Sequence, residues 1–297
     1  MVKRKVVVTG AAGYIFSRML DEFRQRYDLT LLDVTRQTRD GTEIPDIELV
    51  DLTDRNRDAY RAHFRGANAV VHCAFVRAGA RETAPGKGAE AAEAKFQAEF
   101  MNVQLAYNVY QVSVEEGVRR VVVCSSNHAA DYYERLIWAD RFDVVTETMK
   151  TFSDNYYGWA KEAYEDLGFV FATGVENEGR KQQNVQLRIG GPRETDIEHV
   201  GADDLKRVRR ALGAYLSQRD QVQLFVKSIE TENIEDEHGI PFQIFYGISD
   251  NDHKFWSIAH ARRVIGYAPQ DNSAVKFADK IAAIMRTAHQ ANYGADL

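Results

Sequence analysis

The sequence predicts an α/β fold with a doubly wound parallel sheet of the Rossmann type. Along the first half of the chain, short β-rich runs alternate with helical patterns. The runs are almost continuously apolar, which is typical of strands buried on both faces, and helices between them favour a parallel sheet. The five runs lie at residues 5–10, 28–34, 47–52, 68–75 and 119–126.

Periodicity predicts the helices that connect these strands, and the helices are expected at residues 14–26, 54–65, 89–117 and 156–179. Residues 80–95 open with Pro85, Gly86 and Gly88, so we expect a mobile loop before the long helix. A basic amphipathic helix is expected within 206–219 and a terminal helix at 273–290.

The regular pattern weakens after residue 190, which indicates two parts of the chain. We expect a dinucleotide-binding catalytic core at 1–190. The remainder, 191–297, is expected to form mostly a small C-terminal substrate-binding cap, with one strand at 242–249 returning to the core.

Composition narrows the classes of function. The chain has 297 residues and a formal net charge of -6, which argues against nucleic acid as the main partner, because that binding needs a basic face. No run is long and apolar enough for a membrane span or a signal sequence, so we expect a cytoplasmic protein. Cys73 and Cys124 are expected to be buried reduced thiols, and the spacing of the eight histidines predicts no metal site.

A glycine turn and an acid predict a dinucleotide site. Gly10 ends the first strand and Gly13 follows at the spacing of a phosphate-binding turn, where missing side chains let backbone N–H groups face phosphates. Asp33 closes the second strand, 20 residues after Gly13, where a carboxylate can accept both ribose hydroxyls of an adenosine. The alternative for Asp33 is a solvated acid at the end of a strand.

The same residues indicate NAD as the cofactor. A carboxylate at position 33 repels a 2′-phosphate, although Arg36 or Arg39 could meet that phosphate and admit NADP. Phe16 stands where the third glycine of the turn is expected. Because that glycine serves mainly helix–strand packing, we expect a shifted first helix and an altered but functional site.

Tyr157 and Lys161 are the candidate catalytic pair. They are four residues apart, so on a helix they share one face, and the ammonium favours the phenolate form of the tyrosine. A tyrosine placed in this way can act as a general base, whereas an exposed i,i+4 pair is the alternative. Ser125 and Ser126 end a predicted buried strand, at the edge where open α/β sheets bind ligands.

Together these motifs resemble the extended short-chain dehydrogenases/reductases, the NAD-dependent epimerase/dehydratase family, over nearly the whole chain. Further motifs that carry the likeness are "HCA" (72–74), "NV" (102–103), "SSNH" (125–128) and "LRIGGP" (187–192). The resemblance implies Ser126, Tyr157 and Lys161 as catalytic residues and a homodimer formed through the helices near 89–117 and 156–179. The resemblance also implies cofactor-binding roles for Asp51, Leu52, Ala74, Asn102 and Lys161. The other cofactor-binding residues that we expect are Gly10, Gly13, Tyr14, Ile15, Asp33 and Arg77.

Within this family the sequence is most similar to uronate dehydrogenases, which oxidise the anomeric carbon of a sugar acid to a lactone with NAD. The likeness rests on "ADDL" (202–205), "YGISDN" (246–251) and "ARRVIGYAPQD" (261–271). The linker between Gly191 and Asp203 is shorter, with no clear match for the arginine that holds the uronate carboxylate. Arg193 and Arg188 are possible substitutes, although Arg188 is better suited to bracing the sheet.

We therefore expect an NAD-dependent oxidoreductase that moves hydride between a hydroxyl of a sugar or sugar acid and the nicotinamide. Asn127 and His128 would line the substrate pocket, with a helix-capping or core imidazole as the alternative for His128. Arg81 is a candidate for a substrate anion, and a solvated loop arginine is its alternative. The competing functions are a nucleotide-sugar epimerase or dehydratase that retains NAD, and a non-catalytic dinucleotide-sensing protein.

Overall fold

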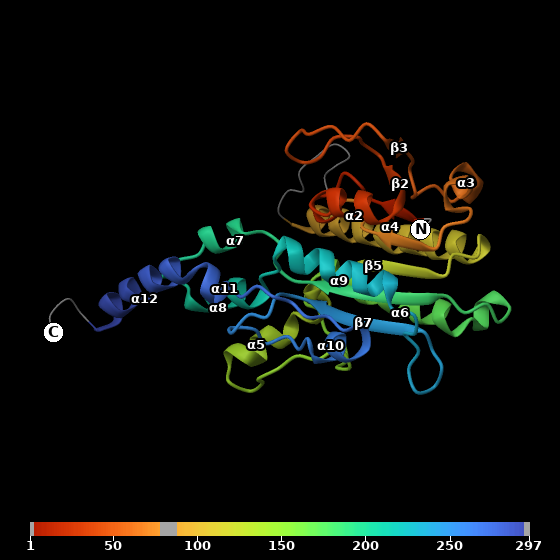
Figure 1. Cartoon of the computed structure of the whole chain (residues 1–297). Helices are drawn as coiled ribbons and strands as arrows, with labels where there is room; N and C mark the ends of the chain where they lie inside the picture. The colour runs from red at the N-terminus through yellow and green to blue at the C-terminus, as the bar shows by residue number, and fades with distance from the viewer. Residues whose placement is uncertain (1–2, 78–87, 294–297) are drawn as a thin grey trace. The chain divides into compact units, whose positions relative to one another are not determined.

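A computed structural model describes residues 3–77 and 88–293 of the chain (Figure 1). Within this part, seven strands form one sheet in the order β3-β2-β1-β4-β5-β6-β7. The pairs β1–β2, β1–β4, β2–β3 and β4–β5 are parallel, which confirms the predicted doubly wound fold. The strands are β1 (Lys5–Thr9), β2 (Asp28–Asp33), β3 (Ile47–Leu49), β4 (Ala69–His72), β5 (Arg120–Ser126), β6 (Gln183–Ile189) and β7 (Phe242–Gly247).

The predicted strands are confirmed, with slightly shorter ends, but β6 was not expected as a separate strand. Its sequence, QNVQLRI, carries four polar residues, yet all except Gln183 are buried. Nε2 of Gln186 donates to the hydroxyl of Tyr110 across 2.9 Å, and Arg188 donates to Glu165 through Nη2 at 2.8 Å. These partners lie far along the chain, so a local pattern does not reveal them.

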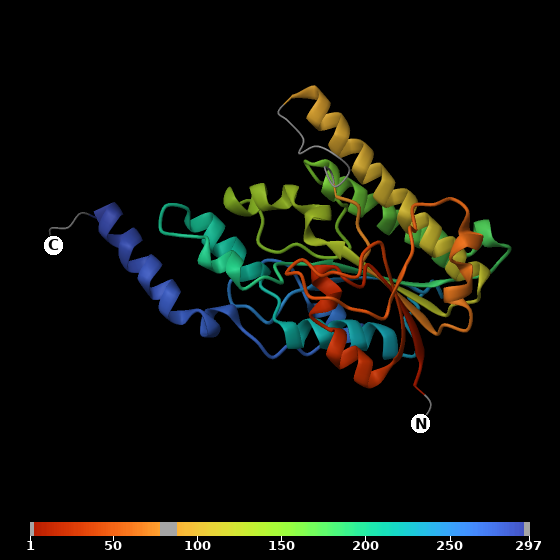
Figure 2. The ribbon, with the colours of Figure 1, turned by 90° about the horizontal axis from the view of Figure 1, so that it is seen from above.

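Helices cover both faces of the sheet. The long helices α4 (Ala89–Glu115) and α6 (Tyr156–Thr173) lie over one face, and α2 (Leu20–Arg26) lies over the other (Figure 2). Core side chains of α4 and α6 pack with strand residues such as Val70 and Val121. The prediction at 156–179 is six residues too long, because Gly174 takes a left-handed φ of 72° and ends α6.

Two other helices are shorter than the sequence indicates. The expected helix at 14–26 is divided into α1 (Tyr14–Ser17) and α2, with the break at Arg18 and Met19. Phe16 precedes this break, is fully buried and contacts the ring of Phe23 edge-on at 5.2 Å. The expected helix at 54–65 is only a 3₁₀ turn, η1 (Arg57–Ala59), followed by α3 (Arg61–Phe64).

The chain divides into two compact units. The first unit comprises 1–131, 151–188 and 228–244, and the second comprises 132–150, 189–227 and 245–297. Residues 132–150 thus belong to the second unit although they precede residue 190. The role of the second unit as a substrate-binding cap stays a prediction.

The second unit is mainly helical and has its own core, which includes Ile197, Val208, Leu212 and Ile284. The expected basic helix is α8, and the expected terminal helix is divided into α11 and α12. Helices α5 and α9 were not expected. The helices are α5 (Tyr132–Trp138), α7 (Thr195–Glu198), α8 (Leu205–Ala214), α9 (Gln218–Glu230, whose last three residues are in the first unit), α10 (Ala259–Ile265), α11 (Ser273–Lys276) and α12 (Ala278–Tyr293).

Two further expectations concern the loop before α4 and the absence of a membrane-spanning segment. Of the segment 80–95, where a mobile loop is predicted, residues 80–87 lie outside the described residues, and α4 begins at Ala89. In the part of the chain that is described, no helix is both long and apolar enough to cross a membrane.

Candidate active site

The glycine turn lies where the carboxyl ends of β1 and β4 meet. Gly10 has a φ of 73°, and its N–H donates to the carbonyl of Leu32 across 2.9 Å. A Cβ atom at Gly10 would lie 2.4 Å from the backbone nitrogen of Ala74, so only glycine fits. A Cβ atom at Gly13 would lie 2.9 Å from the carbonyl oxygen of Gly10. The turn is therefore built from backbone alone, which fits the close approach of a pyrophosphate.

Asp33 reaches this turn from the end of β2. Its Oδ2 accepts from the N–H of Ala12 at 2.9 Å, and its Oδ1 accepts from the N–H of Val34 at 2.7 Å. Burial raises the pKa of Asp33 above its ordinary value, although these N–H groups act in the opposite direction. Arg36 donates through Nε to the carbonyl of Ile47 at 3.0 Å, and Arg39 is exposed.

Other expected cofactor residues lie along the same edge of the sheet. Asn102, on α4, accepts from the N–H of Val76 at 2.7 Å and donates to its carbonyl at 3.0 Å, so it fixes the segment after β4. Asp51 accepts from the N–H of Thr53 at 2.9 Å. The remaining expected cofactor positions are the partly buried Tyr14, Ile15 and Ala74, the buried core residue Leu52 and the exposed Arg77. Arg81, the candidate for a substrate anion, lies outside the described residues.

Tyr157 and Lys161 lie in the first turns of α6. Nζ of Lys161 is 5.3 Å from the ring centroid of Tyr157 and donates to the carbonyl of Cys124 at 2.9 Å. Phe75 contacts the Tyr157 ring edge-on at 5.6 Å. Tyr156 is instead 44% exposed and packs on Phe96 of α4. The two tyrosines thus lie on different faces of the helix.

Ser126 ends β5 next to these side chains. It is buried, and its Oγ accepts from the N–H of His128 at 3.2 Å, which caps the 3₁₀ turn η2 (Asn127–Ala130). A Cβ atom at Gly158 would lie only 2.1 Å from the carbonyl oxygen of His128, so α6 packs directly against this turn. Nδ2 of Asn127 is buried and has no hydrogen-bond partner among the described residues.

A buried ion pair braces the site from behind. Arg188 of β6 donates to Glu165 of α6 through Nε at 3.0 Å and Nη2 at 2.8 Å, and both side chains are at most 2% exposed. Oε1 of Glu165 also accepts from Oγ of Ser125 at 2.5 Å. Strands β5 and β6 are thereby tied to the helix that carries Tyr157.

Sequence reasoning missed two polar residues beside His128. Oδ2 of Asp131 lies 3.0 Å from Nδ1 of His128 and accepts from Nδ2 of Asn155 at 2.8 Å. Asn155 caps α6 by accepting from the N–H of Gly158 at 3.0 Å. Two signals were available: Asp131 follows His128 by three residues, and asparagine immediately before a helix is a common cap.

Arg193 belongs to the second unit, whereas Ser126, Tyr157 and Lys161 belong to the first. It is exposed and precedes α7 in the second unit. A role in binding the substrate stays a prediction for Arg193, as it does for Arg81.

Cys73 directly follows β4, and Cys124 lies within the neighbouring strand β5. Both thiols are free and partly buried. A hydrogen bond with Cys124, together with burial, raises the pKa of the Cys73 thiol. No cluster of metal ligands occurs among residues 3–77 and 88–293.

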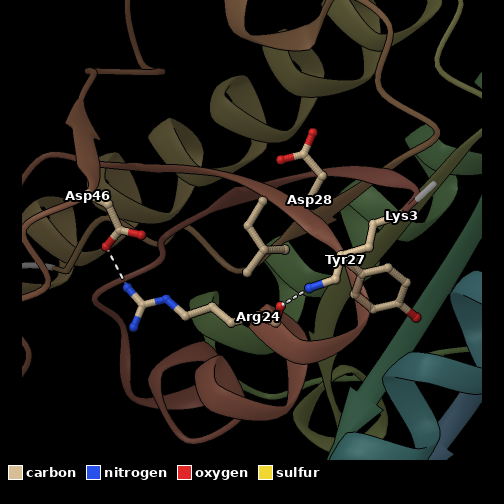
Figure 3. Close-up of a pocket in the computed structure, with 6 residues that line it drawn as sticks. Lys3, Arg24, Tyr27, Asp28 and Asp46 are labelled. Atoms are coloured by element: carbon tan, nitrogen blue, oxygen red, sulfur yellow. Dashed lines mark hydrogen bonds and ion pairs between the residues drawn. The ribbon is translucent and has the colours of Figure 1, made fainter. Parts of the chain in front are cut away.

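A surface pocket lies at the opposite edge of the sheet, where β1 and β2 begin (Figure 3). Three of its charged side chains are bonded within the protein: Lys3 donates to the carbonyl of Arg24 at 2.7 Å, and Arg24 pairs with Asp46 at 2.5 Å. Asp28, which starts β2, also lines it. This pocket is therefore separate from the residues around Tyr157.

Known proteins resemble the chain along most of its length. An NAD-dependent glucose-6-phosphate dehydrogenase of Haloferax volcanii is 30% identical over 285 residues, covering 91% of this chain and 94% of the relative. A uronate dehydrogenase of Pseudomonas syringae pv. tomato is 26% identical and covers 91% and 83%. The crystal structure of uronate dehydrogenase from Agrobacterium tumefaciens has a TM-score of 0.68 at 23% identity, covering 95% of this chain and 90% of that chain.

Residues 6–171 match the model of the "NAD dependent epimerase/dehydratase family". This range contains the glycine turn, Asp33, Ser126, Tyr157 and Lys161, and the backbone turn and the carboxylate at the end of β2 fit a dinucleotide. The chain therefore belongs to the NAD-dependent epimerase/dehydratase family of extended short-chain dehydrogenases/reductases, as its sequence predicts, and is an NAD-dependent oxidoreductase.

Proposed function

We propose that the protein oxidises a hydroxyl group of a sugar or sugar acid with NAD, and that Tyr157 is the general base. The observation that carries this proposal is the position of Lys161, which lies 5.3 Å from the Tyr157 ring and is fixed by the carbonyl of Cys124. A fixed positive charge beside the phenol ring suits a side chain that carries negative charge while it exchanges a proton with an alcohol. The names of the relatives, a glucose-6-phosphate dehydrogenase and a uronate dehydrogenase, support a sugar as the substrate.

Each residue has a separate task in this reaction. Ser126 would donate its hydroxyl hydrogen to the substrate oxygen and hold that oxygen near Tyr157. Tyr157 takes the hydroxyl proton as the carbon–oxygen double bond forms. The hydride leaves the same carbon, and bound NAD supplies the acceptor for it. Lys161 stabilises the charge on the tyrosine throughout.

Asp33 supports NAD as the preferred cofactor. Its carboxylate, which already accepts from Ala12 of the glycine turn, would accept the adenosine ribose hydroxyls and repel a 2′-phosphate. Arg36 is bonded to the carbonyl of Ile47, which reduces its availability for that phosphate.

For the substrate we propose a uronate first, with a differently substituted sugar or a non-sugar alcohol as the next candidates. The buried, unpartnered Nδ2 of Asn127 supports a polar substrate, because an unpaired buried donor is costly until an oxygen accepts from it. His128 would be the second contact on η2. Arg193 and Arg81 are the proposed anion contacts.

The test is NAD reduction with glucuronate, galacturonate, glucose, galactose and glucose 6-phosphate, with Arg193→Ala and Arg81→Ala beside the unmodified protein. We expect activity on at least one sugar acid and a higher KM for it in one variant. Activity on neutral substrates alone, unchanged by either substitution, would remove the anion contacts and leave the dehydrogenase.

The alternative functions predict different products. An epimerase or dehydratase that retains NAD would convert a nucleotide sugar with no net NADH, and a sensing protein would bind NAD without turnover. Release of one NADH for each substrate oxidised excludes both. Ser126, Tyr157 and Lys161, on β5 and α6, favour an enzyme over a sensing protein. The names of the relatives favour a dehydrogenase over an epimerase.

We also propose a homodimer formed through α4 and α6, and a cytoplasmic location. Helices α4 and α6 pack on each other through Phe96 and Trp159, yet they leave large apolar side chains exposed. These are Phe100 and Tyr107 on α4 and Tyr156, Phe169 and Val170 on α6. Sedimentation of the unmodified chain and of Phe100→Glu tests this, and a monomer in both cases would refute the dimer.

A further inference from the structure

We propose that Asp131 is a positioning residue that holds His128 as the Nδ1–H tautomer, so that Nε2 accepts a hydrogen bond from a substrate hydroxyl beside Tyr157. This inference rests on the proposed function for the identity of the ligand. It gives a role to Asp131, which the sequence analysis did not identify as a site residue.

The contact between the two side chains is direct and local. Nδ1 of His128 lies 3.0 Å from Oδ2 of Asp131, which follows η2 immediately. The imidazole is 40% exposed, whereas the carboxylate is 11% exposed. The ring is therefore accessible to a ligand while its partner is held inside the protein.

Asp131 is itself fixed by the helix that carries the tyrosine. Asn155 donates from Nδ2 to Oδ2 of Asp131 at 2.8 Å, and Oδ1 of the same amide accepts from the N–H of Gly158 at 3.0 Å. The carboxylate is thus bonded both to the turn that bears His128 and to the start of α6. It sets the imidazole relative to Tyr157, whose ring His128 meets edge-on at 5.6 Å.

Charge favours the same arrangement. Burial would raise the pKa of Asp131, but hydrogen bonds from His128 and Asn155 outweigh it and hold that pKa below its ordinary value. The carboxylate is therefore ionised at neutral pH and acts only as an acceptor. Among the described residues, the phenol of Tyr157 on α6 also faces the imidazole, and the Lys161 ammonium lies on the ring of Tyr157.

The tautomer decides what the imidazole can recognise. A neutral imidazole that donates from Nδ1 must present a lone pair at Nε2. A lone pair accepts from a hydroxyl and rejects the unprotonated oxygen of a carboxylate or phosphate. The ligand group at this position is thus a hydrogen-bond donor. In the sugar that the proposed function calls for, this donor is a second hydroxyl near the one that is oxidised.

The direct test is the tautomer of His128, measured by long-range ¹H–¹⁵N NMR on the full chain at a pH where imidazoles are neutral. Loss of one signal in His128→Gln assigns the residue among the eight histidines. We expect Nδ1–H in the unmodified protein and a shift toward Nε2–H in Asp131→Ala. Nε2–H in the unmodified protein, or no change in Asp131→Ala, would overturn the proposal.

A matched control removes a neighbouring charge that does not reach His128. Asp154 is exposed and contacts Asn155 at 3.3 Å, so Asp154→Asn should keep the Nδ1–H tautomer. Asp131→Asn keeps the shape of the side chain and serves if Asp131→Ala does not fold. We expect it to weaken the Nδ1–H signature, and an unaltered signature in this variant would count against a role for the charge.

Kinetics separate this inference from the proposed function. With a sugar that turns over, Asp131→Ala should raise KM about tenfold and leave NAD affinity unchanged, because one substrate hydrogen bond is lost. An equal effect on NAD affinity would indicate a general structural role and would overturn the inference. If no sugar is oxidised, the proposed function fails, while the NMR result still decides the tautomer.

Discussion

Lys161 donates a hydrogen bond to the backbone carbonyl of Cys124 across 2.9 Å. This bond joins α6 to β5, the strand that ends in Ser126, and fixes the ammonium 5.3 Å from the ring of Tyr157. The position of the charge is thus set by backbone, and it does not depend on a surface side chain that could move. The catalytic hypothesis is most directly tested at Tyr157.

Replacing Tyr157 by Phe removes the proposed proton acceptor and keeps the ring that packs on Phe75 and His128. We expect kcat to fall by about 10²- to 10⁴-fold, with NAD affinity nearly unchanged in calorimetry. Tyr156→Phe is the control, because Tyr156 packs on Phe96 instead. A larger loss in the control variant would show that the assignment of the base is wrong.

Asp33→Ala should change the preference between cofactors. Loss of a charged acceptor is expected to lower kcat/KM with NAD by about 10- to 100-fold and to affect NADP much less. The measurement is kcat/KM with both cofactors for the variant and the unmodified protein. If the unmodified protein already prefers NADP, the role given to Asp33 cannot hold.

Phe16 should matter more for stability than for cofactor affinity. Its ring is fully buried and packs on Phe23, so Phe16→Ala is expected to lower the free energy of unfolding by about 3–5 kcal/mol. The affinity for NAD in Phe16→Gly should change only modestly, because the turn of Gly10 and Gly13 is unaltered. Denaturant unfolding and calorimetry measure the two effects, and the absence of any NAD or NADP binding to the unmodified protein would contradict a functional cofactor site.

His72 should make the protein less stable in acid. Burial lowers the pKa of His72 to about 3, so the folded state keeps the imidazole neutral while the unfolded chain takes up a proton below its ordinary value of 6.5. The stability contribution is therefore present above that value and is lost as pH falls toward about 3, by ~1.4 kcal/mol per pH unit.

The check is the free energy of unfolding at several pH values for the unmodified protein, His72→Gln and His238→Gln. His238 is highly exposed and serves as the control. The curve for His72→Gln should be flatter within this window, and that for His238→Gln should match the unmodified protein. Parallel curves for all three proteins would contradict a neutral buried imidazole.

The parts that the sequence predicted are those with local signatures. The glycine turn, Asp33 and the Tyr157–Lys161 spacing depend on neighbours along the chain, and the structure brings them to one edge of the sheet. Strand β6 escaped prediction because Gln186 and Arg188 obtain their partners from α4 and α6. The hydrogen bond between Asp131 and Asn155 could not be predicted, because the two residues are 24 positions apart in the sequence and no periodic pattern relates them.

The close contact at Gly158 also bears on how specificity can diversify. A Cβ atom there would clash with the carbonyl oxygen of His128. The backbone of the turn that carries Ser126, Asn127 and His128 is therefore packed tightly against the helix that carries Tyr157. Substitution of side chains on this turn and helix can therefore change the substrate while the backbone contact is kept. An insertion or deletion between Ser126 and Asp131 would disturb that contact, and we expect it to abolish activity before it yields activity on a new substrate.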